Sequence, residues 1–526
     1  MSSMVNGKKA AQYLKTSDAP FLTRIKETEQ DEFAEQAVAK AQDAQWVKRE
    51  AARQELGDWE DWRNLGEQIR QHVIRYLPDY LEEFADNVEK RGGHVFFAQT
   101  DDEAAQYIKR IAIEKKARHV VKSKSMVTSE INLDPTLMTV PGLEVLETDL
   151  AEFILEEDDW DQPTHLVFPA LHKNREQVRQ IFEKKLGYQG DNDPQHMARF
   201  SRTVLRKHFL EADMGITGCN FAVADTGMIN LVTNEGNADL AMCIPRTQVV
   251  VMGMERLVPT MKEAETMDNM LARSAVGQKL TSYLTFTSPR TGQESDGPDD
   301  VYVVILDNGR SNALGTDFEP ILQCIRCASC LNVCPIYRHI GGHGYGSIYP
   351  GPVGSVLSPV LDGGYDDFGD LPYACSLCAA CTATCPVKIP LHELMIKHRK
   401  IMMDDQSKAN LIDDAIMRVV GIGTGHSSLF RTALGLDHTM LAPLARKQPE
   451  TAGNLFSNDR HVEWMPFVFG GWTKVRDLPD PPRHGQNFRS WFARHKKEQG
   501  QRVNGEPVFN KTGSPDGQAD GKGAQA

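Results

Sequence analysis

The sequence lacks an apolar run long enough to cross a membrane. A transmembrane helix needs about 20 consecutive, mostly apolar residues, and the 526-residue chain contains no run that approaches this length. The first nine residues carry a little positive charge, but no apolar stretch follows them, so we expect no signal peptide. We expect a cytoplasmic protein, and any contact with a membrane would be peripheral, at its inner face and through partners.

A surplus of basic residues is missing too. The chain has 72 acidic and 59 basic residues, which gives a net charge of −13. Proteins that bind nucleic acids normally show a basic surplus or a basic patch. We therefore expect no nucleic-acid partner.

Cysteine is scarce outside one stretch of the chain. Eight of the ten cysteines lie between residues 324 and 385. The other two, Cys219 and Cys243, are expected to be small buried apolar residues. Because nothing else in the chain looks secreted, a disulfide framework is not expected.

A complete dinucleotide-binding fingerprint is also absent. Glycines at 342, 344 and 346, and again at 421, 423 and 425, form only G-x-G-x-G patterns. Neither pattern follows a predicted strand, which the fingerprint requires. No flavin or nicotinamide site is visible in the sequence.

The eight clustered cysteines form two copies of one motif, C-x₂-C-x₂-C-x₃-C-P, at residues 324–335 and 375–386. This spacing is typical of modules with two [4Fe–4S] clusters, in which the fourth cysteine of each copy binds the other cluster. The alternative is zinc, but paired C-x₂-C knuckles are its usual pattern. We predict two crosswise ligand sets: Cys324, Cys327, Cys330 and Cys385 for the first cluster, and Cys375, Cys378, Cys381 and Cys334 for the second.

Upstream of these runs, short apolar segments alternate with helical patterns, which is typical of an α/β domain with a largely parallel sheet. A long amphipathic helix over 61–92 precedes them, with apolar residues at three- and four-residue steps. A hairpin is predicted over 218–233, with its turn at Asp225-Thr226-Gly227. The predicted strands are 94–98, 119–122, 164–168, 248–252 and 301–306, and helices are predicted over 102–114 and 175–185.

We predict five parts in the chain. A helical, partly flexible arm (1–60) precedes an α/β domain (61–306). A helical two-cluster domain (307–402) follows, and then a further helical segment (403–480). The polar tail (481–526) is expected to be largely disordered.

Five residues of the α/β domain are candidates for substrate binding. Lys122 and Lys124 follow a predicted strand, where anions bind in α/β sheets, although a solvated basic loop is the plainer interpretation. His165 and His172 could accept a proton from a hydroxyl group near pH 7, but ordinary structural histidines are more common. Arg246 could hold a carboxylate through two hydrogen bonds.

The order of these features resembles the lactate utilization protein B family, the iron–sulfur subunits of a three-protein system for L-lactate oxidation. The resemblance covers about residues 60–480. It is found in segments 122–126, 147–150, 163–172, 215–227, 308–310, 386–390 and 472–479, together with both cysteine runs.

The resemblance implies an α/β lactate-utilization domain, similar in fold to sugar-phosphate isomerases and CoA transferases, followed by a helical ferredoxin-like domain. It implies a subunit of an oxidoreductase rather than a stand-alone enzyme. It also implies two partner subunits, one with cysteine-rich repeats and one a smaller lactate-utilization-domain protein. The family supplies no catalytic residues for this chain.

Two other functions fit the cysteine motif. The chain could transfer electrons from another 2-hydroxy acid, such as glycolate. Alternatively, its clusters could be structural or redox-sensing, with a metabolite bound in the α/β domain. The electron acceptor is not predicted.

Overall fold

The computed structural model describes residues 11–290, 294–404, 411–447, 460–466, 470–473, 477–480, 485 and 487–499. By its internal contacts the chain divides into two compact units, Met1–Gln406 and Ser407–Ala526. The finer division into five parts stays a prediction. Among the described residues, no helix combines the length and the apolar character that a membrane crossing requires.

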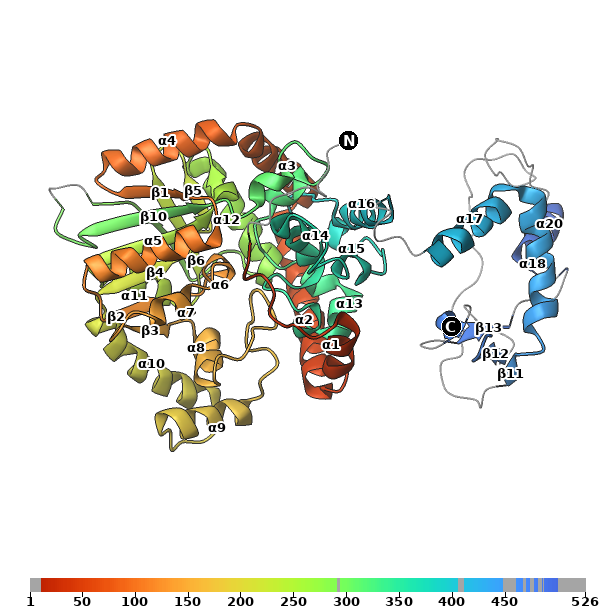
Figure 1. The fold of residues 1–526 in the computed structure, drawn as a ribbon, viewed down its shortest axis with the longest axis horizontal. Coiled ribbons are helices and arrows are strands. Elements are labelled where there is room, and N and C mark those ends of the chain that lie inside the picture. The colour runs from red at the N-terminus through yellow and green to blue at the C-terminus, as the bar shows by residue number, and fades with distance from the viewer. Residues whose placement is uncertain are drawn as a thin grey trace, which may run out of the picture. The chain divides into compact units, whose positions relative to one another are not determined.

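A six-stranded sheet forms the centre of the α/β part of the first unit (Figure 1). Every neighbouring pair of its strands is parallel, so the predicted α/β class is confirmed. All carboxyl ends therefore meet at one edge of the sheet. The strands, in spatial order, are β1 (His94–Ala98), β10 (Asp300–Leu306), β7 (Thr247–Gly253), β4 (Met214–Thr217), β2 (His119–Lys122) and β3 (Glu144–Glu147).

Successive side chains of the central strands pack into the core on opposite faces of this sheet. On β7, Val249 and Val251 pack with α5 (Asp101–Glu114), α6 (Met126–Glu130) and α7 (Leu133–Met138). Val250 and Met252 point the other way, toward α3 (Trp59–Arg75) and α4 (Leu77–Lys90). Successive side chains of a strand point to opposite faces, so a strand buried on both faces is apolar throughout.

A smaller sheet lies beside the second face. Its order is β8 (Leu257–Val258), β5 (Phe221–Val223), β6 (Met228–Thr233) and β9 (Tyr283–Thr287). β5 and β6 are antiparallel, which confirms the predicted hairpin. Its turn uses Gly227 at a φ of 69°, a conformation that favours glycine. The other helices of the α/β part are α8 (Leu150–Glu157), α9 (Arg175–Leu186), α10 (Pro194–Glu211), α11 (Asn237–Cys243) and α12 (Met261–Val276).

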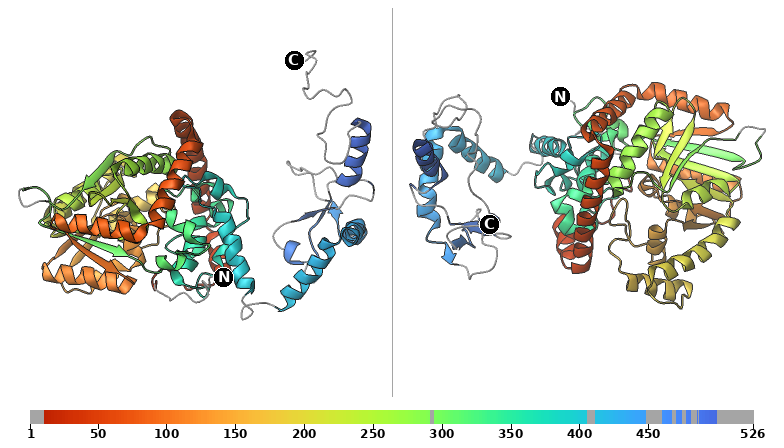
Figure 2. Two further views of the ribbon diagram at one scale, coloured as in Figure 1. Left: turned by 90° about the horizontal axis from the view of Figure 1, so that it is seen from above. Right: turned by 180° about the vertical axis from the view of Figure 1, so that it is seen from behind.

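The cysteine runs lie among short helices that follow β10. These are α13 (Pro335–Ile340), α14 (Gly351–Asp362), α15 (Ala380–Thr384) and α16 (Leu391–Asp404). Near the N-terminus, α1 (Phe21–Thr28) and α2 (Glu32–Leu56) pack against this part (Figures 1 and 2). The Gln42 amide of α2 donates to the carbonyls of Leu331 and Cys334, at 2.8 and 3.1 Å.

Two predicted elements are wrong. The helix predicted over 61–92 is two helices, α3 and α4, because Tyr76 leaves helical geometry and Pro78 begins a new first turn. The strand predicted over 164–168 is a loop. There the backbone N–H groups of Val167 and Phe168 donate to His165 Nδ1, at 3.0 and 3.1 Å, instead of to a neighbouring strand.

The second unit contains α17 (Leu411–Gly425), α18 (Ser427–Leu441), α19 (Gly470–Thr473) and α20 (Phe488–Gln499). A small antiparallel sheet joins β11 (Arg446–Lys447), β12 (Arg460–Val462) and β13 (Leu478–Pro479). Helix α20 lies in the tail that was predicted to be largely disordered. Its Phe488, Trp491 and Phe492 rings contact one another at helical spacing. Residues 500–526 of that tail lie outside the described residues.

Candidate functional site

The two cysteine runs share one backbone conformation. Arg326 and Ala328 have φ values of 60° and 58°, and Leu377 and Ala379, at the matching positions of the second run, have 57° and 61°. Left-handed residues at two fixed positions reverse the chain between successive cysteines. Each run therefore wraps its first three cysteines around a common space, with Ala328 and Ala379 at positions where glycine would be less strained.

Cysteines from both runs line the same small cavity near the first run. Its wall includes Cys324, Cys327, Cys330 and Cys385. The last three are more than nine-tenths buried. Burial raises the pKa of the Cys330 thiol well above its ordinary value, and the nearby Cys324 and Cys327 raise it further, with a contribution from Cys385.

The other four cysteines gather beside the second run. Burial raises the pKa of Cys381 to about 12, and the neighbouring Cys334, Cys375 and Cys378 raise it further. This group is less covered than the first, because Cys378 is exposed and Cys375 is half-buried. Cys330 also interacts electrostatically with Cys381, so the two groups approach each other there.

Backbone amides are aimed at the sulfurs in both runs. The N–H groups of Arg326 and Leu377 donate to Cys324 and Cys375 Sγ, at 3.4 and 3.3 Å. The fourth cysteines accept in the same way, Cys334 Sγ from Tyr337 at 3.5 Å and Cys385 Sγ from Ile389 at 3.4 Å. Such hydrogen bonds stabilise thiolates and tune bound clusters. The described residues therefore fit two cubane clusters.

The arrangement does not suit a single zinc ion. Within the part of the chain that the structure describes, no three His, Cys, Asp or Glu side chains converge to hold one metal ion. Zinc needs ligand sulfurs about 2.3 Å from one centre. Sulfurs spread around the wall of a cavity fit a larger, multi-iron body instead.

Helix α2 places two arginines over the first group of cysteines. The fully buried Arg49 donates to the hydroxyls of Ser329 and Thr384, one from each run. Arg53 donates to the Thr384 carbonyl at 3.2 Å. Burial lowers the pKa of Arg49 to about 10, while Cys327 and Cys330 act to raise it. Both arginines thus place positive charge near the first cysteine group.

A second and larger cavity, of about 710 Å³, lies at the carboxyl edge of the main sheet. The chain leaves β2 toward β3 on one side and leaves β4 toward β7 on the other. Ligands of open α/β sheets bind at such a switch point. The cavity is lined there by Ser123 and Ser125 after β2 and by Gly218 and Asn220 after β4.

This cavity extends to the first cysteine run. Arg326 and Cys327 line its wall, together with Leu166, and all three also line the cysteine cavity. Glu235 lines it as well, and burial and the nearby Asp149 raise the pKa of its carboxyl group to about 7. A carboxylate that titrates near neutral pH can accept a proton from a substrate.

The two candidate lysines have different surroundings. Lys122 is fully buried, where its ammonium group bonds to Glu147 and lies 3.3 Å from Asp134. Its charge is matched inside the protein, and it does not line the large cavity. Lys124 does line the cavity, and its ammonium group donates to the Leu166 carbonyl.

Both candidate histidines have polar partners, although the buried Nδ1 of His172 has none among the described residues. The buried His165 accepts two backbone hydrogen bonds at Nδ1, and its Nε2 lies 3.2 Å from Asn332 Oδ1. Burial and the nearby Lys124 lower the pKa of His165 to about 3, so the ring is neutral at pH 7. His172 Nε2 lies 3.0 Å from Asp161 Oδ2.

Arg246 lies at the opposite edge of the sheet, just before β7. Its side chain is 87% exposed and donates to Asp299 at 3.0 Å. Two cavity arginines, Arg256 and Arg326, were not among the predicted site residues. Arg256 comes three residues after β7, and the rule that ligands bind beyond carboxyl ends could have pointed to it. Arg326 lies within the first cysteine run.

Three family models match the chain. A LUD domain matches residues 81–306, a 4Fe-4S dicluster domain matches residues 320–389, and a model described as lactate utilisation protein B, C-terminal, matches residues 392–497. The first match contains the whole parallel sheet, and the second contains all eight clustered cysteines.

Curated relatives match almost the full chain. Lactate utilization protein B of Geobacillus thermodenitrificans is 54% identical over 485 residues, which cover 92% of this chain and 98% of that protein. The Bacillus licheniformis protein of the same name is 51% identical over 489 residues, 93% and 99% of the two chains. A solved structure of a DUF162 family protein from Deinococcus radiodurans aligns with 44% of this chain and 98% of its own, at 18% identity and a TM-score of 0.26.

Proposed function

The chain belongs to the lactate utilization protein B family, and from this membership we propose that it is the iron–sulfur electron-transfer subunit of a system that oxidises L-lactate to pyruvate. Its proposed cofactors are two [4Fe–4S] clusters, bound by the crosswise ligand sets. Its proposed partners are two further subunits, one with cysteine-rich repeats and one a smaller lactate-utilization-domain protein.

The arrangement of the cysteines supports electron transfer through two clusters most directly. Cysteines from both runs line one cavity, and the two cysteine groups approach each other at Cys330 and Cys381. Oxidation of lactate to pyruvate releases two electrons and two protons. Each [4Fe–4S] cluster, when bound, accepts or releases one electron, so a pair of adjacent clusters suits a two-electron substrate.

Residues of the chain bury the first cysteine group and place positive charge near it. Helix α2 buries the first cysteine group and places Arg49 and Arg53 near it. The second group is exposed at Cys378. We infer that the first group lies toward the substrate cavity and the second toward the electron acceptor.

The test is reduction by substrate. The chain is purified without oxygen, together with whatever subunits co-purify. L-lactate, D-lactate or glycolate is then added, and visible bleaching and the EPR signal of reduced clusters are followed. Reduction by L-lactate alone supports the proposal. Reduction by glycolate alone would reassign the substrate, and reduction by dithionite but by no hydroxy acid would refute the lactate assignment.

The ligand sets are tested by serine substitutions. Cys385→Ser is expected to remove the cluster of the first run, and Cys334→Ser that of the second, because each supplies the fourth ligand to the opposite run. Iron content and EPR are the readouts. The matched control is Cys243→Ser, which should change neither cluster. Cys243 lies outside both runs, and the prediction that it is buried is wrong, because it is exposed. If Cys385→Ser instead removed the cluster of its own run, the crosswise assignment would be wrong.

A further inference from the structure

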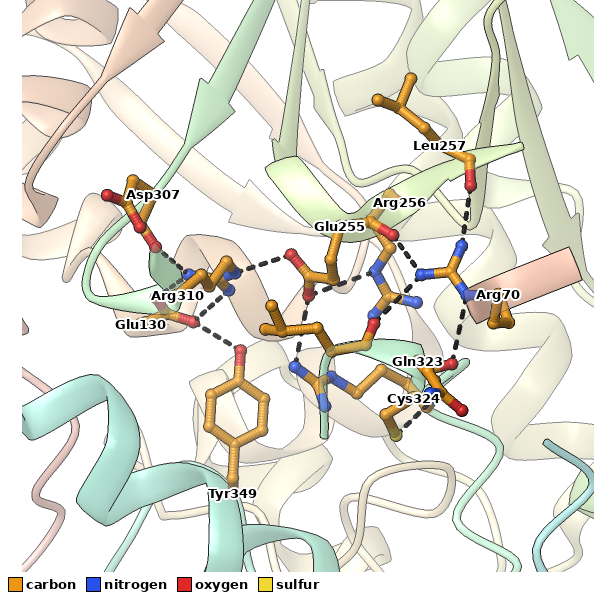
Figure 3. A network of polar contacts seen from close by, with 12 residues as sticks. Arg70, Glu130, Glu255, Arg256, Leu257, Asp307, Arg310, Gln323, Cys324 and Tyr349 are labelled. Carbon is orange, nitrogen blue, oxygen red and sulfur yellow. Dashed lines mark hydrogen bonds and ion pairs between the residues drawn. The ribbon is translucent and has the colours of Figure 1, made fainter. Parts of the chain in front are cut away.

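Four arginines surround two buried carboxylates where the α/β part meets the first cysteine run (Figure 3). Glu255 and Glu130 are at most 1% exposed. The arginines are Arg70, Arg256, Arg310 and Arg326, whose guanidinium groups interact electrostatically with Glu255 or Glu130. The arginines thus outnumber the carboxylates two to one.

Two of these arginines each donate four hydrogen bonds within the protein. Arg310 donates to Glu255 at 2.8 Å and to both Glu130 oxygens at 2.8 and 2.9 Å. Arg70 donates to four backbone carbonyls, among them Leu257 at 2.7 Å (Figure 3). The two carboxylates are therefore satisfied mainly by Arg310, and Arg70 is held by the backbone.

The other two arginines keep unused donors. Arg326 is nine-tenths buried and donates to Glu255 at a long 3.4 Å, while its Nη1 is buried without a partner among the described residues. Among the described residues, Arg256 forms an ion pair with Glu255. Its Nε lies 3.9 Å from Glu255 Oε1, which is beyond hydrogen-bond length. The buried Nη1 of Arg326 costs free energy unless an acceptor is supplied.

Both of these arginines line the large cavity. We propose that Arg256 and Arg326 bind the carboxylate of a 2-hydroxy acid in this cavity, next to Cys327 of the first ligand set. The choice of a 2-hydroxy acid rests on the proposed function. The binding site itself rests on the unused donors and on the position of the cavity.

A carboxylate fits the two arginines better than a neutral ligand does. A guanidinium group presents planar, paired donors that match the two oxygens of a carboxylate. Glu255 already accepts a short hydrogen bond from Arg310. Its contacts with Arg256 and Arg326 are longer, so N–H groups of these two arginines remain available to a ligand. The cavity volume lies within the 300–1,000 Å³ typical of ligand pockets, and it leaves room for water beside a small acid.

The decisive experiment uses calorimetry to measure binding of oxamate, a redox-inert analogue of the 2-oxo acid product that carries the same carboxylate group. It uses the full chain with its clusters oxidised and without oxygen. Arg256→Gln is expected to weaken binding at least tenfold, and Arg256→Lys, which keeps the charge but loses the paired donors, less. Arg110→Gln is the matched control, because Arg110 is exposed on α5 and contacts Tyr107. Iron content and visible absorption establish that each variant is folded and loaded.

Two results would overturn the inference. In one, the wild-type chain does not bind oxamate. In the other, Arg256→Gln binds oxamate as wild type does but shifts the reduction potential of the first cluster, so that the arginine serves only the cysteine ligands. A different result would refute the proposed function but not the binding site. If oxamate binds through Arg256 but no hydroxy acid reduces the clusters even with the partners present, the site stands and the lactate assignment falls.

Discussion

At the scale of single residues, Asp268 gives the stability of the first unit a pH dependence. This residue of α12 is 1% exposed and accepts a hydrogen bond from Asn230 Nδ2 at 3.0 Å. Burial raises the pKa of its carboxyl group from an ordinary 3.8 to about 7, although the hydrogen bond from Asn230 lowers it. The folded protein therefore binds this proton more tightly than the unfolded chain does.

The stabilisation from this proton is present below about pH 4 and is lost as the pH rises through about 7. With 1.36 kcal/mol for each pKa unit, the titration of Asp268 should lower the free energy of unfolding by about 3 kcal/mol between pH 5 and pH 8. Asp268→Asn keeps the acceptor for Asn230 and removes the ionisation. Urea unfolding at the two pH values should show a smaller decrease in this variant than in wild type.

The control for Asp268 is Glu82→Gln, since Glu82 is an exposed carboxylate on α4. It should leave the difference between the two pH values as in wild type. If Asp268→Asn loses as much stability between pH 5 and pH 8 as wild type does, Asp268 is ionised throughout and is stabilised by contacts other than those described.

At the scale of elements, α2 adds positive charge to the first cysteine group. Arg49→Gln keeps a polar side chain near Ser329 and Thr384 but removes a buried charge close to Cys327 and Cys330. A positive charge favours the reduced, more negative cluster. The reduction potential of the first cluster should therefore fall by about 60 mV for each 1.4 kcal/mol of attraction lost. An EPR-monitored redox titration measures the shift.

Lys48→Gln provides the comparison on the same helix. Lys48 is exposed, and charges in water are screened far more than buried ones. Its substitution should move neither potential by more than a few millivolts. Equal shifts in the two variants would mean that the helix acts through overall charge and not through the contacts of Arg49.

The elements also show how far local pattern determines structure. The predicted strands 94–98 and 119–122 match β1 and β2 residue for residue, because each is a short apolar run ended by a turn. The predicted strand at 164–168 had a similar composition and was wrong, since two of its amides bond to His165 and no strand among the described residues pairs with it. An apolar run becomes a strand only where another strand pairs with it. A single sequence does not show which segments pair.

At the scale of the whole first unit, the site combines residues that the sequence keeps apart. The cysteine motif could be predicted because all of its members lie in two short runs. The cavity could not, because its wall joins loops after β2 and β4 to Arg256 and Arg326. Lys122 shows the converse, since a lysine in a promising position proved to be paired with Glu147 in the interior. Burial and partner choice arise only when distant segments pack together.

The division of the chain into two units leads to a last prediction. All eight clustered cysteines, the parallel sheet and α2 lie in the first unit, which ends at residue 406. A chain that ends at residue 404 should therefore fold and bind both clusters, with the iron content and EPR spectrum of the full chain. Its reduction by L-lactate in the presence of the partner subunits is then compared with that of the full chain. Full iron content with lost reduction would assign the second unit to contact with partners, whereas lost iron would show that the first unit depends on the second for its stability.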